Sequence, residues 1–365
     1  MKIVILAHDN DNHTAPLKWA LEEAGYNVVC WSGLGWDEPR QASITLDGDS
    51  RLMLGPHSVD PGDVVWIRRP NPAVHNPKVA DPDKSFAEGE YRWSSWAVIY
   101  LLGTLSVRCI NPYSASRFIN NKSVQLLLAR ECGMHVPETL MSNNPAAVRA
   151  FLEQRRQKNG RTICKAFFPH VWQKSSGGIA VTETFEIFAD QLPSDEVLTF
   201  APAIYQEMVV KQFDVRMVLL GTTVYSYALH NPKGALDWRQ DCGQGLVEVR
   251  VIDTPPEVEK SVLEFARRAG TTFGSLDFAI DNQGRWWFLE INEEGQFLWL
   301  DEFNPEVRMQ QKFLAFLTSP EGSSRQVIEE RQSQFLGWKD FLASPKKDEV
   351  PPEEHTGVQF VSVEP

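Results

Sequence analysis

Short apolar runs and helical patterns alternate in the first part of the chain. Residues 2–7 form a β-branched run that is typical of a buried parallel strand, and residues 16–25 carry apolar side chains at helical spacing. Residues 26–31 and 64–70 are typical of two further strands, the second of which ends at a proline. This β-α-β order predicts a small open α/β domain at the N-terminus.

A second pattern, alternation of apolar and polar residues on both sides of a polar turn, predicts a β-hairpin from residues 274–281 and 286–292. Asp277, Glu290 and Asn292 interrupt the apolar positions of this hairpin. Glu290 and Asn292 are two residues apart, so on a strand they point to the same face, and Asp277 can lie opposite them on the partner strand.

Three oxygen ligands on one face of a sheet suit a hard cation such as Mg²⁺, which proteins usually hold through one or two carboxylates while substrate phosphates fill other positions. The alternative is a hairpin with a solvated polar face. The apolar surroundings favour the metal hypothesis, because they would make solvated carboxylates costly there.

The middle of the chain predicts helices at 116–132 and 145–157, and a strand at 161–167 with Lys165 inside it. A lone lysine in an apolar strand has to meet an anion or reach water. A small loop with Ser176 and Gly177 follows, whose backbone N–H groups could approach phosphates, although the loop taken alone favours a plain surface turn.

Two other features have competing interpretations. Arg68 and Arg69 end a strand of the N-terminal domain, where α/β proteins usually bind ligands, so they indicate either anion binding or a surface ion pair. The apolar helix predicted at 91–105 contains Trp93 and Trp96, which we interpret as core residues rather than a platform for a ligand.

Composition narrows the class of protein. The 365 residues are 42% hydrophobic and 23% charged, which is ordinary for a globular protein, and they allow two or three domains. The net charge of −12, with no dense run of lysine and arginine, argues against a nucleic-acid partner. Five scattered cysteines suggest neither a zinc site nor a disulfide framework. Without a signal peptide or a long apolar run, we expect no membrane partner and a cytoplasmic protein.

Taken together, the motifs resemble the ATP-grasp superfamily and, more narrowly, the RimK-like ligases of the microviridin or graspetide type, which modify ribosomal peptides. The likeness covers roughly residues 110–318 and rests on Asn121-Lys122 with Gln125, Gly133, Pro137 to Leu140, Lys165, Gln206-Glu207, Asp214 to Arg216 with Gly221, Asp237-Trp238-Arg239, Asp277-Phe278, and Phe288 to Phe297. This chain departs from the family pattern at Glu293 and Glu294, where a small residue or proline is usual, and in its short glycine loop.

The resemblance implies an ATP-grasp fold of mixed α/β and α+β class, preceded by the open α/β domain. It divides the chain into an N-terminal domain (1–112), a central subdomain (113–202), a C-terminal subdomain with the metal site (203–318), and a polar helix with a mobile tail (319–365). Homodimers are the assembly that it suggests.

It also implies roles for individual residues. Lys122 and Lys165 would neutralise phosphate oxygens of ATP, and Asp277, Glu290 and Asn292 would hold one or two Mg²⁺ ions. Arg216 would stabilise an acyl phosphate and the oxyanion that follows it. Further nucleotide-binding positions are Ser176, Gly177, Gln206, Glu207, Met208, Val209, Lys211 and Asp214, of which Asp214 would either orient Arg216 or be structural.

The implied reaction joins a carboxylate to an amine or hydroxyl through an acyl phosphate, so it needs no enzyme nucleophile. Arg239 would bind a substrate carboxylate, with a loop ion pair as the alternative, and His230 would be a base or a loop residue without a role. The expected substrate is a ribosomal precursor peptide with leader and core, whose Glu or Asp side chains are linked to Ser, Thr or Lys. Two alternatives remain: a ligase for free amino acids or protein C-termini, and a binding module without turnover, in which Glu293 and Glu294 spoil the metal site.

Overall fold

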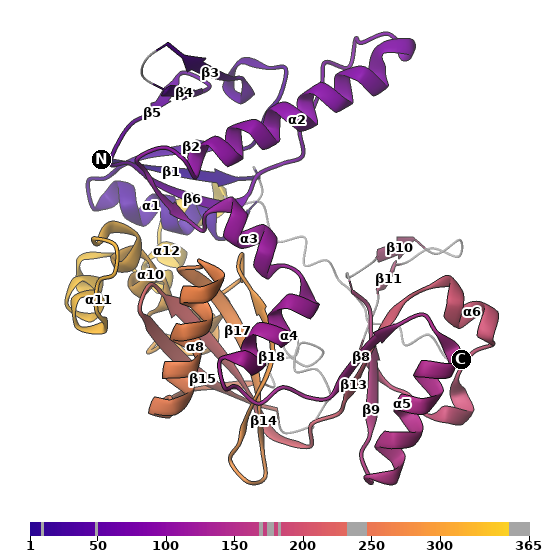
Figure 1. Cartoon of the computed structure of the whole chain (residues 1–365). Coiled ribbons are helices and arrows are strands. Elements are labelled where there is room, and N and C mark those ends of the chain that lie inside the picture. Colours follow the sequence, from indigo (N-terminus) through magenta and orange to yellow (C-terminus); the bar gives the residue numbers. More distant parts are fainter. Residues whose placement is uncertain are drawn as a thin grey trace.

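A computed structural model of the chain shows three larger β-sheets with helices packed on them (Figure 1). The residues that the structure describes are 1–8, 11–47, 50–167, 171–173, 179–181, 184–231 and 247–349. Besides the elements treated below, the short ones are β10 (Val171–Gln173), β11 (Ile179–Val181), η1 (Glu38–Arg40), η2 (Asp81–Asp83), η3 (Ala189–Gln191), η4 (Gln332–Gln334) and η5 (Pro345–Glu349).

The N-terminal sheet is parallel, with the order β2-β1-β6-β7. Its strands are β1 (Lys2–Ala7), β2 (Asn27–Trp31), β6 (Val64–Arg69) and β7 (Arg108–Ile110). Alternate residues of β1 pack on opposite sides: Ile5 lies in one apolar cluster with Leu17 of α1 (Thr14–Glu23), and Val4 lies in another with Val98 of α2 (Lys84–Leu102). This is the open α/β arrangement that the alternation of strand and helix predicts.

Two features of this region differ from the prediction. A separate antiparallel sheet, β3 (Ala42–Leu46), β4 (Ser50–Leu54) and β5 (His57–Val59), occupies a stretch in which we predicted no strands. On α2, the side chains of Trp93 and Trp96 are 65% and 37% exposed, so the interpretation of both as core residues is wrong. The sequence pattern shows that this helix is apolar, but α2 buries only the side that carries Val98 and Leu102.

The helix predicted at 116–132 is two helices, α3 (Tyr113–Ile119) and α4 (Lys122–Glu131). The break occurs because Asn121 caps α4: its side-chain oxygen accepts hydrogen bonds from the N–H groups of Ser123 and Val124. Lys122 is therefore the first residue of a new helix rather than a position in the middle of a long one, which gives its side chain freedom to reach beyond the helix end.

The central sheet is antiparallel, with the order β12-β9-β13-β8. Its strands are β8 (Thr139–Ser142), β9 (Thr162–Lys165), β12 (Phe185–Glu186) and β13 (Ala203–Glu207), and the neighbouring helices are α5 (Pro145–Gln157) and α6 (Asp195–Phe200). Val148, Leu198 and Tyr205 share one small apolar cluster here. Because β13 pairs with β8 and β9, the strand at residue 203 belongs to this sheet, and the next sheet begins after it.

The third sheet has the order β16-β15-β14-β17-β18 and is antiparallel throughout. Its strands are β14 (Lys211–Leu220), β15 (Thr223–His230), β16 (Glu248–Ile252), β17 (Phe273–Asp281) and β18 (Trp286–Asn292). The pairing of β17 with β18 confirms the predicted hairpin. Its register shifts between Asp277 and Phe278, so that Leu289 is an extra residue on β18.

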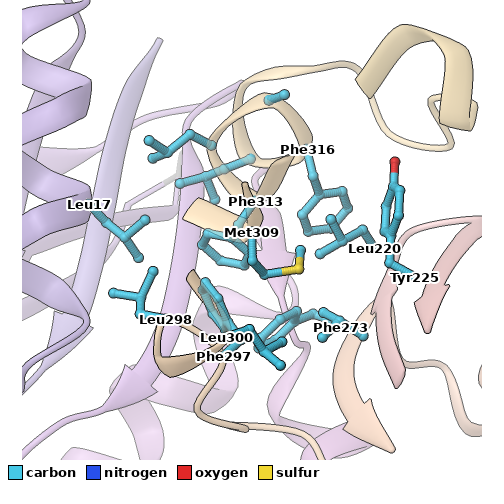
Figure 2. Close-up of a cluster of buried hydrophobic side chains, with 14 of the residues drawn as sticks. Leu17, Leu220, Tyr225, Phe273, Phe297, Leu298, Leu300, Met309, Phe313 and Phe316 are labelled. Atoms are coloured by element: carbon cyan, nitrogen blue, oxygen red, sulfur yellow. The ribbon is translucent and has the colours of Figure 1, made fainter. Parts of the chain in front are cut away.

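The two faces of this sheet meet different helices. One face packs Val215, Leu276 and Phe288 with α4 and with α8 (Pro256–Ala269). The apolar half of the other face packs against α9 (Trp299–Phe303) and α10 (Met309–Thr318), where Phe273, Phe297 and Phe313 lie side by side (Figure 2). The polar half of that second face holds the candidate site.

The end of the described chain is more structured than predicted. Helices α11 (Arg325–Arg331) and α12 (Trp338–Ala343) bury Ile328 and Phe341, and Phe335 between them packs against Tyr26 of the N-terminal domain. Among the described helices, none combines the length and the apolar character that crossing a lipid bilayer requires.

Candidate functional site

The predicted metal ligands lie on one face of the β17–β18 hairpin. Asp277 is directly opposite Glu290, and Asn292 is opposite Ser275, which is two residues from Asp277. Side chains of directly paired residues share a face, so two carboxylates and one amide oxygen gather there. Within the described ranges, no three His, Cys, Asp or Glu side chains form a metal cluster, so the amide of Asn292 is needed to complete a three-ligand set.

Cations balance both carboxylates. Arg216 pairs with Asp277 across β14 and β17, with its Nη1 3.0 Å from Oδ1 of Asp277, and both side chains are largely buried. The guanidinium carbon of Arg216 also lies 5.7 Å from the ring centroid of Trp299. The second carboxylate, Glu290 of β18, accepts a hydrogen bond at Oε2 from Nζ of Lys122 in α4 over 3.1 Å. Along β14, β17, β18 and α4, this face therefore carries two neighbouring carboxylates with a cation on either side of them.

Gln125 fixes the helix that carries Lys122. This buried side chain uses both ends of its amide on the free edge of β18: Nε2 donates to the carbonyl oxygen of Ile291 over 3.0 Å, and Oε1 accepts from the Ile291 N–H over 3.1 Å. The two bonds replace those that another strand would make. The start of α4 is thus held beside Glu290.

Lys165 approaches the same place from the central sheet. Its Nζ donates to Oε1 of Gln206 over 2.9 Å, and Nε2 of Gln206 donates to the hydroxyl of Thr139 over 2.8 Å. Lys122, Lys165 and Glu290 line one narrow cavity between the central and third sheets, whose apolar walls include Met141, Ile204 and Leu289. The two lysines that are far apart in sequence are therefore brought together.

Of the other predicted nucleotide-binding residues, Gln206 contacts a cavity residue, Lys165, and residues 207–209 follow it along the chain. Gln206 is buried in β13, whereas Oε1 of Glu207 accepts a hydrogen bond from Arg155 over 2.6 Å. The N–H of Met208 donates to the carbonyl of Arg161 over 2.9 Å, and Val209 follows it, half-buried. The backbone N–H of Met208 is thus engaged within the protein in this conformation.

Lys211 and Asp214 form an ion pair at the start of β14. Nζ of Lys211 lies 2.9 and 2.7 Å from the two carboxylate oxygens of Asp214. Asp214 and Arg216 are two residues apart on the strand and share its polar face, but Asp277 is the carboxylate that faces Arg216. This geometry favours the structural alternative for Asp214.

Some predicted positions lie outside the described residues: Ser176 and Gly177 of the small loop, and Arg239 with its neighbours Asp237 and Trp238. His230 is described. It ends β15 opposite Glu248, and its ring packs against Phe213 with 4.9 Å between centroids.

The acidic pair that follows the metal strand does not join the metal face. Glu293 is buried and accepts hydrogen bonds from the Ser116 hydroxyl over 3.0 Å and from the Asn120 amide over 2.6 Å. Burial, reinforced by the charge of Glu294, raises the pKa of Glu293 to about 7. The carboxylate of Glu294 instead pairs with Arg69 of β6 over 3.1 Å.

The N-terminal domain supports the loop after β18 through residues that the sequence analysis did not single out. Nε2 of the buried His13 accepts hydrogen bonds from the N–H groups of Phe297 and Leu298, over 2.9 and 3.2 Å. Burial and the nearby charges of Arg68 and Arg69 lower the pKa of His13 well below its usual value, which keeps the ring neutral and able to accept.

The two arginines at the end of β6 make ion pairs. Arg68 is fully buried, and its Nε is 3.2 Å from the Asp11 carboxylate. Arg69 pairs with Glu294. Of the two interpretations, the ion pair is therefore the one present, although for Arg68 the pair is buried rather than on the surface.

Solved structures share this fold over most of the chain. A RiPP-associated ATP-grasp ligase from Chryseobacterium gregarium, in complex with ADP and with a leader and core peptide, has a TM-score of 0.76 and 22% identity, covering 89% of this chain and 99% of that chain. The macrocyclase MdnC of Microcystis aeruginosa, bound to the precursor peptide MdnA, has a TM-score of 0.70 and 24% identity, covering 87% and 99%.

The ATP-grasp ligase PsnB, complexed with Mg, ADP and a phosphomimetic variant of a minimal precursor, has a TM-score of 0.65 and 21% identity, covering 87% of this chain and 97% of that chain. Neither a family model nor a curated protein matches the chain. At these identities the comparisons establish the fold: this chain has the ATP-grasp architecture with an N-terminal open α/β domain, as its motifs indicate.

Proposed function

We propose that this protein is an ATP-dependent carboxylate ligase that cyclises a ribosomal precursor peptide. It would join Glu or Asp side chains of the core to Ser, Thr or Lys side chains, forming esters or amides. The observation that carries the proposal is the convergence of Lys122, Lys165 and Glu290 on one cavity between two antiparallel sheets, beside the pair of Arg216 and Asp277. The solved structures with this fold bind ADP, magnesium and precursor peptides, which supports the same chemistry here.

The residues present fit ATP and Mg²⁺. Asp277, Glu290 and Asn292 offer the oxygen ligands that Mg²⁺ prefers, and Lys122 and Lys165 offer cations for phosphate oxygens. Bound Mg²⁺ would offset the negative charge of the triphosphate. The ammonium group of Lys122 forms an ion pair with Glu290 in the structure. When ATP binds, the ammonium would exchange this carboxylate for a phosphate oxygen in the same cavity.

The reaction would have two steps. A substrate carboxylate oxygen attacks the γ-phosphorus, the bond to the bridging oxygen breaks, and ADP leaves. An amine or hydroxyl of the peptide then attacks the acyl carbon, loses its proton, and inorganic phosphate leaves. Arg216 would stabilise the negative charge of the acyl phosphate and of the tetrahedral oxyanion, because its guanidinium is fixed on the polar face by Asp277.

The remaining assignments are part of the same proposal. Gln206, Glu207, Met208 and Val209 would border the adenine, Lys211 and Asp214 would support the margin of the site, Ser176 and Gly177 would close over phosphates, and Arg239 would bind a substrate carboxylate. The four parts of the chain would follow the boundaries given above, with β13 joined to the central sheet. We further propose a homodimer acting in the cytoplasm, where ATP and ribosomal peptides are both made.

Incubation with ATP, Mg²⁺ and the small peptide encoded beside the gene, followed by mass spectrometry, tests the proposal. We expect the peptide to lose one water mass per bond formed, with one ADP released for each. Glu290→Gln is the matched control and should leave the peptide unchanged. ADP release with free amino acids alone would instead identify a small-molecule ligase, and peptide binding without ADP formation would identify a binding module.

A further inference from the structure

The loop that follows β18 is tied to the segment that precedes α4. Glu293 directly follows Asn292, the last of the proposed magnesium ligands, and its carboxylate accepts a hydrogen bond at each oxygen. The Ser116 hydroxyl donates to Oε2 over 3.0 Å, and the Asn120 amide donates to Oε1 over 2.6 Å. Ser116 lies in α3 and Asn120 ends it, two residues before Lys122, with which α4 begins (Figure 1).

The backbone of the same glutamate is held as well. Nδ2 of the buried Asn111 donates to the carbonyl oxygen of Glu293 over 3.3 Å and to that of Phe273 over 2.7 Å. Oδ1 of Asn111 accepts from the N–H of Phe273 over 2.9 Å. Phe273 is the first residue of β17, the strand that carries Asp277. Glu293 is therefore joined to the start of β17 through its backbone and to the entry of α4 through its side chain.

The turn that begins at Glu293 orients the amide of Asn292. Oδ1 of Asn292 accepts a hydrogen bond from the N–H of Glu294 over 3.1 Å, and the carbonyl oxygen of Asn292 accepts one from the N–H of Gly295 over 3.1 Å. The N–H of Glu294 selects the oxygen end of the amide, and an amide oxygen has a second lone pair left for a cation. Moving Glu293 would move the N–H of Glu294 with it, and so would change where the oxygen points.

Two contacts flank the start of α4. Gln125 of this helix is bound to Ile291, and Asn120, on the other side of Lys122, is bound to Glu293. With Gln125 alone, the start of the helix could pivot about one point. Two points of attachment, one to β18 and one to the loop after it, fix its direction.

We infer that Glu293 is a positioning residue, which sets the place of the Lys122 ammonium relative to the amide oxygen of Asn292. The inference rests on the proposed nucleotide and metal site. It gives a role to an acidic side chain at a position where the resembled family usually has a small residue or proline. Removing a group that only orients a metal ligand typically lowers metal affinity about 10- to 100-fold.

An exchange of polar groups between positions 120 and 293 tests this role. In Asn120→Asp two carboxylates face each other, so their contact is lost. When Asn120→Asp is combined with Glu293→Gln, the new amide can donate to the aspartate while its oxygen accepts from Ser116, so both hydrogen bonds return. Glu293→Gln alone keeps both contacts too, because the Ser116 hydroxyl can accept as well as donate.

The readout is the binding of Mn²⁺ to the full-length protein at saturating ADP, measured by electron paramagnetic resonance, with the melting temperature recorded on the same samples. We expect the Kd for Mn²⁺ to rise by roughly tenfold to a hundredfold in Asn120→Asp and in Glu293→Ala. It should return to the wild-type value in the double variant and keep that value in Glu293→Gln. Glu294→Gln loses only the ion pair with Arg69 and keeps its backbone N–H, so this matched control should bind like the wild type.

A lower melting temperature with unchanged Mn²⁺ affinity in Asn120→Asp would show that the contact only stabilises the fold, and would overturn the inference. So would a double variant that does not recover binding. A loss in Glu293→Gln as large as that in Glu290→Gln would make Glu293 a metal ligand itself. If Glu293→Ala does not fold, Asn120→Asp, at an exposed position, decides the matter with its double variant.

The same titration separates this role from the proposed function. A wild-type protein that binds no Mn²⁺ with ADP would reject the metal site and the role of Glu293 together, whereas binding that no variant changes would reject only the role of Glu293. Cyclisation of the peptide, measured separately, reports on the ligase proposal.

Discussion

The side-chain amide of Gln125 makes hydrogen bonds to both backbone groups of Ile291, on the outer edge of β18. One glutamine therefore joins the helix that carries Lys122 to the strand that carries Glu290. Gln125 thereby positions Lys122 and Glu290, although its hydrogen bonds are made to the backbone of Ile291 and not to either charged group.

Replacing this glutamine by leucine should destabilise the protein and loosen the site. Gln125→Leu leaves the buried N–H of Ile291 without its acceptor, which costs about 1–3 kcal/mol. We expect a loss of that size in chemical denaturation, together with weaker ATP binding. Gln326→Leu, at an exposed position of α11, is the control and should change the stability by less than about 0.5 kcal/mol.

Glu290 and Glu294 should differ sharply in their effect on turnover. Glu290→Gln removes a proposed metal ligand, and since its ion pair with Lys122 is partly exposed, we expect turnover to be lost with little change in melting temperature. Glu294→Gln touches only the pair with Arg69, so turnover should fall by less than about tenfold, or 1.4 kcal/mol. Equal losses in both variants would show that the acidic pair belongs to the metal site.

Arg216 should matter more for catalysis than for ATP binding. Deleting one partner of a largely buried ion pair endangers the fold, so Arg216→Lys, which keeps the positive charge, is the more informative variant. A lysine cannot present two parallel donors to an oxyanion. We expect kcat to fall by roughly tenfold to a hundredfold or more and the Kd for ATP to stay nearly constant. A parallel loss in both would assign Arg216 to ground-state binding.

The buried His13 should make the stability depend on pH. In the folded state its pKa is lowered, so the unfolded chain binds a proton that the native protein does not. This contribution is fully favourable above a pH of about 6.5, and below that value it is lost by up to about 1.4 kcal/mol per pH unit.

The matched comparison is between His13→Gln, whose amide oxygen can still accept from Phe297 and Leu298, and His57→Gln, which alters an exposed histidine. Unfolding free energies at pH 5, 6 and 7 should decline less steeply for His13→Gln than for the wild type. The same slope in all three proteins would reject the role of His13.

The sequence predicts features whose cause is local. The alternation around Asp277 and Glu290 predicts the hairpin, but the two carboxylates share one face only because the register shifts at Leu289, which the alternation does not predict. The break between α3 and α4 is also local, since Asn121 is a good cap, and attention to caps would have found it.

Local sequence patterns do not predict which side chains meet when the two residues are far apart along the chain. Glu293 is bound by Ser116, which is 177 residues away, and Glu294 by Arg69, which is 225 residues away. Trp93 and Trp96 were misplaced for a related reason: helical apolarity shows that a side chain avoids water, but not whether its own chain or another molecule covers it.

The extra residue Leu289 has a consequence for how the site tolerates change. Phe288 and Glu290 are two positions apart, yet the shift sends the ring into the core with α8 and the carboxylate to the opposite side. Losing or adding a single residue here would exchange the two destinations, forcing a charge among the phenylalanines or an aromatic ring into the candidate site. In this part of the strand, the site therefore depends on the spacing of the residues as well as on their identity.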